Sequence, residues 1–241
     1  MLVYPEERVP IARLLAFLEQ GERLAHDCAR AQAGLAPDGK MRRFLLGQAR
    51  QEAVHAVVFQ GVIAWLAPRH LGPSPLLPPL ERYRALLDRA IRERNFVETL
   101  LAEQIILEGL GEAILGRIEE GLAKRGAAFG PLRRILLRQE EAHHAFGCRA
   151  LDRAIAEGRT STEELRSRAQ EYLALIDAMV ATLVDLFESI EEDPSAWLTD
   201  ARRYLPSWLT AEGERQVARG NGPESLDSSK VPNPEPLAPR P

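Results

Sequence analysis

The sequence predicts an all-α protein: a four-helix bundle with a long central crossover and an additional C-terminal helix. Sustained alternation of polar and apolar residues with a period of two is absent, so strands are not expected. Long stretches rich in Ala, Leu, Arg and Glu are instead separated by Pro and Gly. A Pro-rich segment divides these stretches into two groups, as expected for a crossover between helix pairs.

Two helices are expected before the Pro-rich segment. The first covers about residues 10–34 and the second about residues 40–67, each with apolar residues at helical spacing. Pro37 and Gly39 separate them. The following segment, 68–79, contains too many prolines to be helical throughout.

Three helical stretches are expected after it. The first covers about residues 80–125, as one helix or as two joined near Asn95. The second covers about residues 132–157. The third opens with a Ser-x-x-Glu capping box at Ser161 and is expected to end at Pro194.

One domain is expected over residues 1–210, followed by a disordered tail, 211–241. Hydrophobic residues make up 45% of the chain, which is enough for one sizeable core. The short apolar piece 197–209 is expected to dock on the bundle. The tail is rich in Pro, Ser, Asn and Gly and offers little to bury.

The charge and the cysteine content indicate which partners and which cellular compartment to expect. The net charge is −4 and the basic residues form no stripe, so nucleic acid is not an expected partner. No segment approaches the ~20 apolar residues of a membrane-spanning helix. Cys28 and Cys148 form no Cys-x-x-Cys pair, and we expect both to be buried small residues of a cytoplasmic protein.

A hexapeptide that occurs twice is the strongest functional feature. Arg-Gln-Glu-x-x-His occurs in the second predicted helix, with Glu52 and His55, and in the fourth, with Glu140 and His143. A spacing of three residues places the carboxylate and the imidazole on one face of a helix. Two such helices facing each other, with one more carboxylate from each remaining helix, can hold two divalent iron ions.

Those two remaining carboxylates have several candidates. On the first helix, apolar neighbours favour Glu22, although Glu19 also lies near the apolar stripe. The candidates on the third stretch are Glu98, Glu103, Glu108 and Glu112, and the apolar neighbours of Glu108 favour it. On an α-helix Glu103 lies about 140° from Glu108, so the two are not expected to face one site, whereas Glu112 lies only about 40° away.

Several nearby residues carry competing interpretations. A lone Glu-x-x-His is common on soluble helices, and Glu141 with His144 is the overlapping alternative that the repeat register disfavours. His26 is expected to be a hydrogen-bonded residue of the core or of the ligands' surroundings. Gly109 and Gly111 are read either as close helix packing or as space beside the metals. The roles of Glu112, His26 and the tail stay open.

Over about residues 10–157 the chain resembles the ferritin-like diiron-carboxylate superfamily. The order Glu, Glu-x-x-His, Glu, Glu-x-x-His over four helices is similar to that of aldehyde-deformylating oxygenases and of ribonucleotide reductase small-subunit relatives. The resemblance implies six metal ligands, namely Glu22, Glu52, His55, Glu108, Glu140 and His143. It implies two Fe ions as the cofactor, and a Mn/Fe pair would suit the same ligands.

Three departures from these families matter. Phe59 stands where radical-generating subunits carry Tyr, so a tyrosyl radical of that type is not expected. Gln51 and Gln139 stand where many relatives carry an Asp that orients a His ligand. Cys-x-x-Cys pairs are missing from the sequence, so electrons are expected from an external reductase or from the substrate.

The predicted function is that of a diiron oxidase or oxygenase. It would act with dioxygen on a small, partly apolar organic substrate, in a pocket shaped by segment 68–79 and the fifth helix. The alternative is an iron-handling protein, a ferroxidase or storage subunit of the ferritin-like class. The sequence identifies neither the substrate nor the electron donor, and it leaves open whether the chain forms a homo-oligomer.

Overall fold

The computed structural model describes residues 3–66, 77–127, 130–183, 187–188 and 193–210. Over these residues it is helical and contains no strand. In chain order the elements are α1 (Arg8–Leu35), α2 (Gly39–Leu66), α3 (Leu77–Arg92), α4 (Phe96–Leu100), the π-helix η1 (Leu101–Leu107), α5 (Glu108–Lys124), α6 (Gly130–Ala156), α7 (Thr162–Ala181), α9 (Pro194–Arg203) and the 3-10 turn η2 (Ser207–Leu209).

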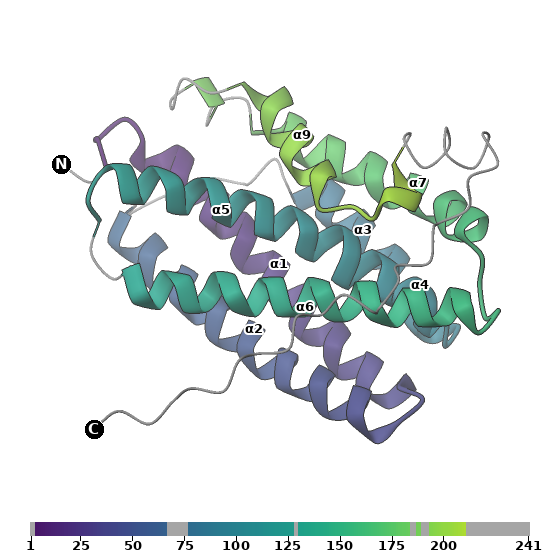
Figure 1. The fold of residues 1–241 in the computed structure, drawn as a ribbon. Helices are drawn as coiled ribbons and strands as arrows, with labels where there is room; N and C mark the ends of the chain where they lie inside the picture. Colours follow the sequence, from purple (N-terminus) through teal and green to yellow (C-terminus); the bar gives the residue numbers. More distant parts are fainter. Residues whose placement is uncertain (1–2, 67–76, 128–129, 184–186, 189–192, 211–241) are drawn as a thin grey trace, which may run out of the picture.

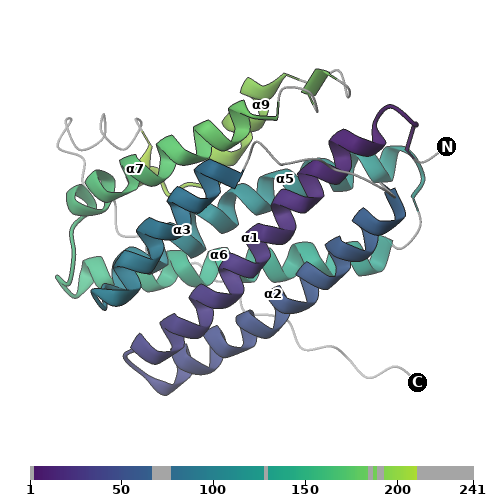
Figure 2. The ribbon, with the colours of Figure 1, turned by 180° about the vertical axis from the view of Figure 1, so that it is seen from behind.

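Four helical rods form the bundle. They are α1, α2, the continuous run α4–η1–α5, and α6, and they lie side by side with α3, α7 and α9 along the side away from α2 (Figures 1 and 2). The predicted all-α bundle with an additional C-terminal helix is therefore confirmed. Segment 68–79 and the tail 211–241 lie largely or wholly outside the described residues. None of the described helices is long and apolar enough to cross a membrane.

The first two helices form an antiparallel hairpin. Asp38 starts α2, because its carboxylate accepts hydrogen bonds from the backbone N–H groups of Lys40 and Met41, both at 2.8 Å. Halfway along the pair, Nδ1 of His26 donates to the carbonyl oxygen of Ala49 at 2.6 Å. His26 therefore ties α1 to the backbone of α2, within the range of roles expected for it.

The third predicted stretch is divided near Asn95, as one of the two expectations had it. Arg94 adopts φ 57°, in the left-handed region, and this ends the run of α3. Asn95 then caps α4 by accepting a hydrogen bond from the N–H of Glu98 at 3.1 Å. From there the chain stays helical to Lys124, so α4, η1 and α5 form one continuous rod.

The end of the fifth predicted helix differs from expectation. Ser161 caps α7 by accepting from the N–H of Glu164 at 3.1 Å, as the capping box predicts. However, α7 ends at Ala181 and does not continue to Pro194. Pro194 instead occupies the first turn of α9, where its missing N–H costs nothing, and Asp193 caps that helix.

The C-terminal piece docks on the bundle, as expected for residues 197–209. Trp197 of α9 is buried and packs edge-to-face on Phe187, with ring centroids 5.2 Å apart. The guanidinium of Arg117 on α5 lies 5.3 Å from the Trp197 ring and bonds Asp200 of α9 at 2.7 Å. Helix α9 therefore stiffens α5, which carries part of the site.

Candidate metal centre

The six predicted ligands lie together inside the bundle. They form two buried groups that share Glu52 and Glu140, and within each group one ligand atom per residue lies within 4.8 Å of the others. Glu22 and His55 complete the first group, and Glu108 and His143 complete the second. Helices α1 and α5 supply one carboxylate each, and α2 and α6 supply one carboxylate and one imidazole each.

The imidazoles point one nitrogen, Nδ1, into the carboxylates. Nδ1 of His55 lies 2.9 Å from Glu140 and 3.1 Å from Glu52. Nδ1 of His143 lies 2.9 Å from Glu52 and 3.8 Å from Glu108. Each helix with a Glu-x-x-His pair therefore sends its carboxylate to the imidazole of the other, which is the symmetry that the repeated hexapeptide implies.

The second nitrogen of each ring is held by the glutamine of the opposite hexapeptide. Nε2 of His55 donates to Gln139 Oε1 at 2.8 Å, and Nε2 of His143 donates to Gln51 Oε1 at 2.8 Å. An amide oxygen only accepts, so Nε2 carries the proton and Nδ1 can offer its lone pair to a cation. Each glutamine thus fixes the orientation of the imidazole on the opposite helix.

Burial and mutual contact shift the acidity of the cluster. Burial raises the pKa of both Glu22 and Glu108 well above the usual carboxyl value, and the charges of neighbouring carboxylates add to it. Burial would raise the pKa of Glu140 as well, but the adjacent imidazoles of His143 and His55 hold it low. Although burial disfavours the charged ring, the adjacent carboxylates of Glu140 and Glu52 raise the pKa of His143 to about 9.

Unsatisfied polar atoms indicate that the cluster fits a metal. Among the described residues, both carboxylate oxygens of Glu52, Oε1 of Glu140 and Nδ1 of His143 are buried without a hydrogen-bond partner. Such atoms are costly to bury unless something binds them. Four carboxylates and two imidazoles form the oxygen- and nitrogen-rich ligand set that suits iron or manganese. The residues present therefore fit a pair of divalent ions.

Glu19 and Glu22 have different surroundings. Glu22 contributes to the cluster, and its Oε2 lies 3.3 Å from Nδ1 of His55. Glu19 is equally buried, but its carboxylate bonds Arg23 on its own helix and Gln60 on α2, at 2.8 Å for the latter. Burial alone therefore could not separate the two, because both carboxylates face α2.

The α-helical angle of about 140° between Glu103 and Glu108 does not hold, although only Glu108 contributes to the two ligand groups. The chain forms a π-turn over Leu101–Leu107, and the N–H of Glu108 bonds the carbonyl oxygen of Glu103, five residues back. This wider turn brings the two carboxyls to one side of the rod. Nε2 of Gln48 donates to both, at 3.0 Å to Glu103 and 2.8 Å to Glu108. Burial raises the pKa of Glu103 to about 8.

A chain of buried amides supports this side of the site, and sequence reasoning missed it. Gln32 and Gln104 exchange two hydrogen bonds, at 2.9 and 2.7 Å, across α1 and η1. Gln104 also donates to Gln48 at 3.3 Å, so the chain of bonds ends at Glu108. The sequence feature that could have predicted this chain is the presence of three glutamines at positions expected to be buried, because buried amides require hydrogen-bond partners.

The remaining carboxylates of the third stretch lie outside both groups. Glu98 is buried, but it bonds Asn95, Tyr172 and Arg168 and so joins α4 to α7. Glu112 lies 3.6 Å from Nδ1 of His144, and burial followed by the charge of Glu141 raises its pKa to about 7.

The overlapping pair that the repeat register disfavours also lies outside both groups. Glu141 is exposed and His144 is half-buried, and neither contributes a ligand atom to the two clusters. Of the two cysteines, Cys28 is buried as expected, whereas Cys148 is only half-buried.

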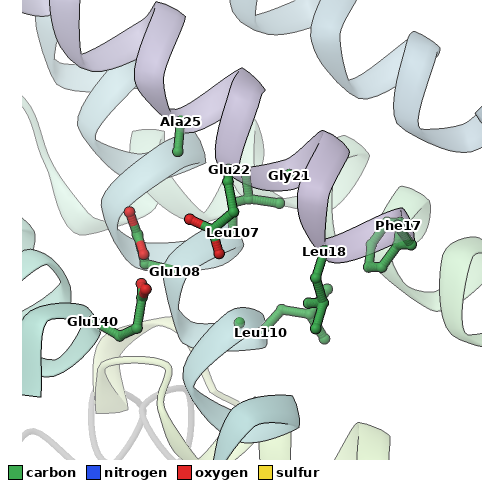
Figure 3. A pocket seen from close by; sticks show the side chains of 10 residues that line it. Phe17, Leu18, Gly21, Glu22, Ala25, Leu107, Glu108, Leu110 and Glu140 are labelled. Carbon is green, nitrogen blue, oxygen red and sulfur yellow. The ribbon is translucent and has the colours of Figure 1, made fainter. Parts of the chain in front are cut away.

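A pocket leads to the carboxylates from one side. It is small, with a cavity volume of about 30 Å³. The lining is mostly apolar and comes from α1, η1, α5 and α6, namely Phe17, Leu18, Gly21, Glu22, Ala25, Leu107, Glu108, Leu110, Gly111 and Glu140. Figure 3 shows Glu22, Glu108 and Glu140 turned toward one another, with Leu18, Leu110 and Phe17 to one side of them. The fifth helix, α7, contributes no lining residue, contrary to expectation.

Of the two glycines near Glu108, one fits the interpretation as close packing and the other fits the interpretation as space beside the metals. A Cβ at Gly109 would lie 3.3 Å from Cβ of Tyr204, so this glycine lets the C-terminal segment pack closely. A Cβ at Gly111 would meet nothing within 4 Å, and Gly111 lines the pocket. Gly109 therefore serves packing, and Gly111 leaves space beside the candidate metal site.

Comparison with known proteins supports the fold. No family model matches the sequence, and no curated protein matches it. Among solved structures, the chain is similar to protein 19 with aldehyde deformylating oxidase activity from Synechococcus, with a TM-score of 0.73 and 21% sequence identity. The match covers 91% of this chain and 99% of that chain. The chain therefore has the ferritin-like helical-bundle fold, with a metal-capable group of carboxylates and imidazoles at its centre.

Proposed function

We propose that the chain is a non-haem diiron oxidoreductase that acts on a small, partly apolar organic molecule. The observation that carries this proposal is the pair of buried groups sharing Glu52 and Glu140. In it, Glu22 and His55 would complete the ligands of one ion, and Glu108 and His143 those of the other. Bound iron would supply the redox chemistry with dioxygen.

The protein's own residues would position and protect the reacting groups. Gln51 and Gln139 fix the orientation of the two imidazoles, so that each keeps Nδ1 directed inward. Leu18, Leu107 and Leu110 would hold the apolar part of a substrate and exclude water from the carboxylates behind them.

The pocket favours an enzyme over an iron-storage protein. An iron path would need polar groups along its length, whereas the lining here is apolar until it reaches Glu22, Glu108 and Glu140. The similar Synechococcus protein has aldehyde deformylating oxidase activity, so an aldehyde is the first substrate to test.

The test compares two double variants, one inside the cluster and one outside it. E52A/H143A removes one carboxylate and one imidazole of the cluster, whereas E141A/H144A changes a neighbouring pair outside it. Anaerobic Fe(II) titration should count two ions in the native chain and in E141A/H144A, and fewer in E52A/H143A. Dioxygen and aldehyde consumption should follow the iron content.

Two results would contradict the proposal. Equal iron binding by both double variants would exclude this site. A large mineral load per chain, without aldehyde-dependent dioxygen uptake, would favour the iron-handling alternative.

A further inference from the structure

Glu103 is a buried carboxyl that belongs to neither ligand group. Its side chain is fully buried, with 0% of its surface exposed. Its Oε1 accepts a hydrogen bond from Gln48 at 3.0 Å, but its Oε2 is buried without a hydrogen-bond partner. Such an atom is costly to bury unless something binds it. A purely structural role of Glu103 therefore accounts for one of its oxygens and leaves the other unexplained.

The π-turn places Glu103 beside a predicted ligand. The N–H of Glu108 bonds the carbonyl oxygen of Glu103, so the two residues are one π-turn apart on the rod. One nitrogen, Nε2 of Gln48, donates to Oε1 of both carboxyls, and two acceptors on one nitrogen lie close together. Turns of this kind are frequent at functional sites.

Glu103 also lies within the electrostatic reach of the cluster. After burial, the largest effects on its pKa come from the adjacent carboxyl of Glu108 and from the charges of Glu52 and His143. Because Glu103 is outside both groups, its carboxyl has to turn about its side-chain bonds to reach an ion. That turn breaks its bond with Gln48, while Gln48 keeps its bond to Glu108.

The charge of the cluster indicates when a further carboxylate would bind. The four predicted carboxylate ligands carry four negative charges when ionised, which balance two divalent ions. Oxidation of both ions removes two electrons, which dioxygen accepts in the proposed reaction, and leaves two positive charges unbalanced in a buried site. A fifth carboxylate offsets one of them, and buried charges need an opposite charge close by.

We propose that Glu103 is a seventh protein ligand, which binds the ion of Glu108 and His143 when the metal pair is oxidised. The inference rests on the proposed function, because that function supplies the oxidation. In this step the hydrogen bond between Glu103 and Gln48 breaks, an oxygen–iron bond forms, and a proton held by the carboxyl leaves to solvent. Reduction of the pair reverses these changes.

The test compares E103Q with E112Q in the iron-loaded protein. Glutamine at position 103 keeps an oxygen that can accept from Gln48, but it is neutral and removes the carboxylate. Glu112 is the matched control. Burial raises its pKa too, and its Oε2 is buried without a hydrogen-bond partner, but it lies beside His144 and outside both groups.

We expect E103Q to raise the midpoint reduction potential of the iron pair, because a neutral side chain stabilises trivalent ions less. A tenfold loss of preference for the oxidised ion corresponds to about 59 mV in a one-electron couple, and we expect at least this shift in a spectroelectrochemical titration. Release of iron from the oxidised protein to a chelator should be faster by at least about tenfold. E112Q should match the native chain in both measurements.

Manganese(II) separates a ligand of the oxidised pair from general damage to the site. Free Mn(II) is counted by its electron paramagnetic resonance signal under anaerobic conditions. E103Q should bind two Mn(II) ions as the native chain does, whereas E108Q, which lacks a predicted ligand, should bind one of them more weakly. Ferricyanide can prepare the oxidised iron pair, so a failed aldehyde test would contradict the proposed function and still leave this test decisive.

Three results would overturn the inference in a native chain that binds two iron ions. The first is a reduction potential and a rate of iron release in E103Q equal to the native values. The second is a loss of Mn(II) affinity in E103Q as large as in E108Q, which would separate the role of Glu103 from oxidation. The third is a structure of the oxidised, iron-loaded protein in which Glu103 still accepts from Gln48 and does not contact iron. A native chain that binds no iron would contradict the proposed function as well.

Discussion

At the scale of single residues, the reciprocal contacts between the two hexapeptides define the site. Each supplies a carboxylate to the cluster, an imidazole to the cluster and an amide to the imidazole of the other. Gln51 and Gln139 are neutral, so they orient the rings without adding further negative charge to four buried carboxylates. An aspartate at either position would have added it.

We expect Q139A to weaken iron binding at the ion that His55 would hold. Loss of the amide leaves Nε2 of His55 without its acceptor, so the ring can turn and its Nδ1 leaves the cluster. Changes to such supporting partners typically cost about 10–100-fold in metal affinity. Anaerobic Fe(II) titration should therefore give one weakened site.

Q60A is the matched control for Q139A. Gln60, on α2, is also a glutamine that donates a hydrogen bond to another helix, but its acceptor is Glu19, outside the cluster. Equal iron affinity in Q60A and Q139A would show that the amide of Gln139 does not support the ring.

The sequence allowed the cluster to be predicted residue by residue, but not its surroundings. Spacing and the repeat are local properties, so they identify Glu140 and His143 before any fold is known. The carboxylate of Glu19 is bound by Arg23 and Gln60. These contacts could not be predicted from the apolar residues that flank Glu19 in the sequence.

At the scale of elements, the π-helix η1 has the largest effect on the site. A periodicity of 3.6 places Glu103 and Glu108 apart, whereas the wider turn aligns them under Gln48. The helix ends were predicted closely except that of α7, because Pro, Gly and capping residues act locally. The π-turn could not be predicted, since it depends on packing between η1 and α6.

We expect G147A to destabilise the protein through that packing. A Cβ at Gly147 would overlap Cβ of Gln104 and lie 3.3 Å from its backbone carbon, so η1 must move. Overpacking of this kind typically costs about 1–3 kcal/mol. Urea unfolding of the metal-free protein measures the loss.

G116A provides the comparison in a helix interior with free space. A Cβ at Gly116 would meet nothing within 4 Å, so the usual gain of about 0.5–1 kcal/mol for Gly to Ala in a helix is expected. If G147A were as stable as G116A, the close approach of α6 to η1 would not matter to the fold.

At the scale of the whole molecule, one ion pair joins the start of α1 to the end of α5. Glu7 accepts hydrogen bonds from Arg125 at 2.7 and 2.9 Å and from the N–H of Tyr4 at 2.8 Å. The bonds with Arg125 lower the pKa of Glu7 below its usual value. These contacts close the end of the bundle beyond the pocket residue Phe17.

The Glu7 pair should make stability depend on pH in acid. Since the folded-state pKa is lowered, the stabilisation is complete above the unfolded value of 4.5 and is lost as pH falls through the folded value. We expect E7Q to lose about 1 kcal/mol at pH 7 and much less near pH 3, measured by urea unfolding. E6Q, at the exposed neighbouring carboxylate, should match the native chain at both pH values.

The crossed arrangement of Gln51, Gln139 and the two imidazoles has a mechanical consequence. Each bond joins α2 to α6, and the two run in opposite senses along the helix pair. A slide of α2 against α6 in either direction therefore strains both bonds at once. Sliding of the two helices should loosen both halves of the site together, whereas loss of one amide releases one ring only.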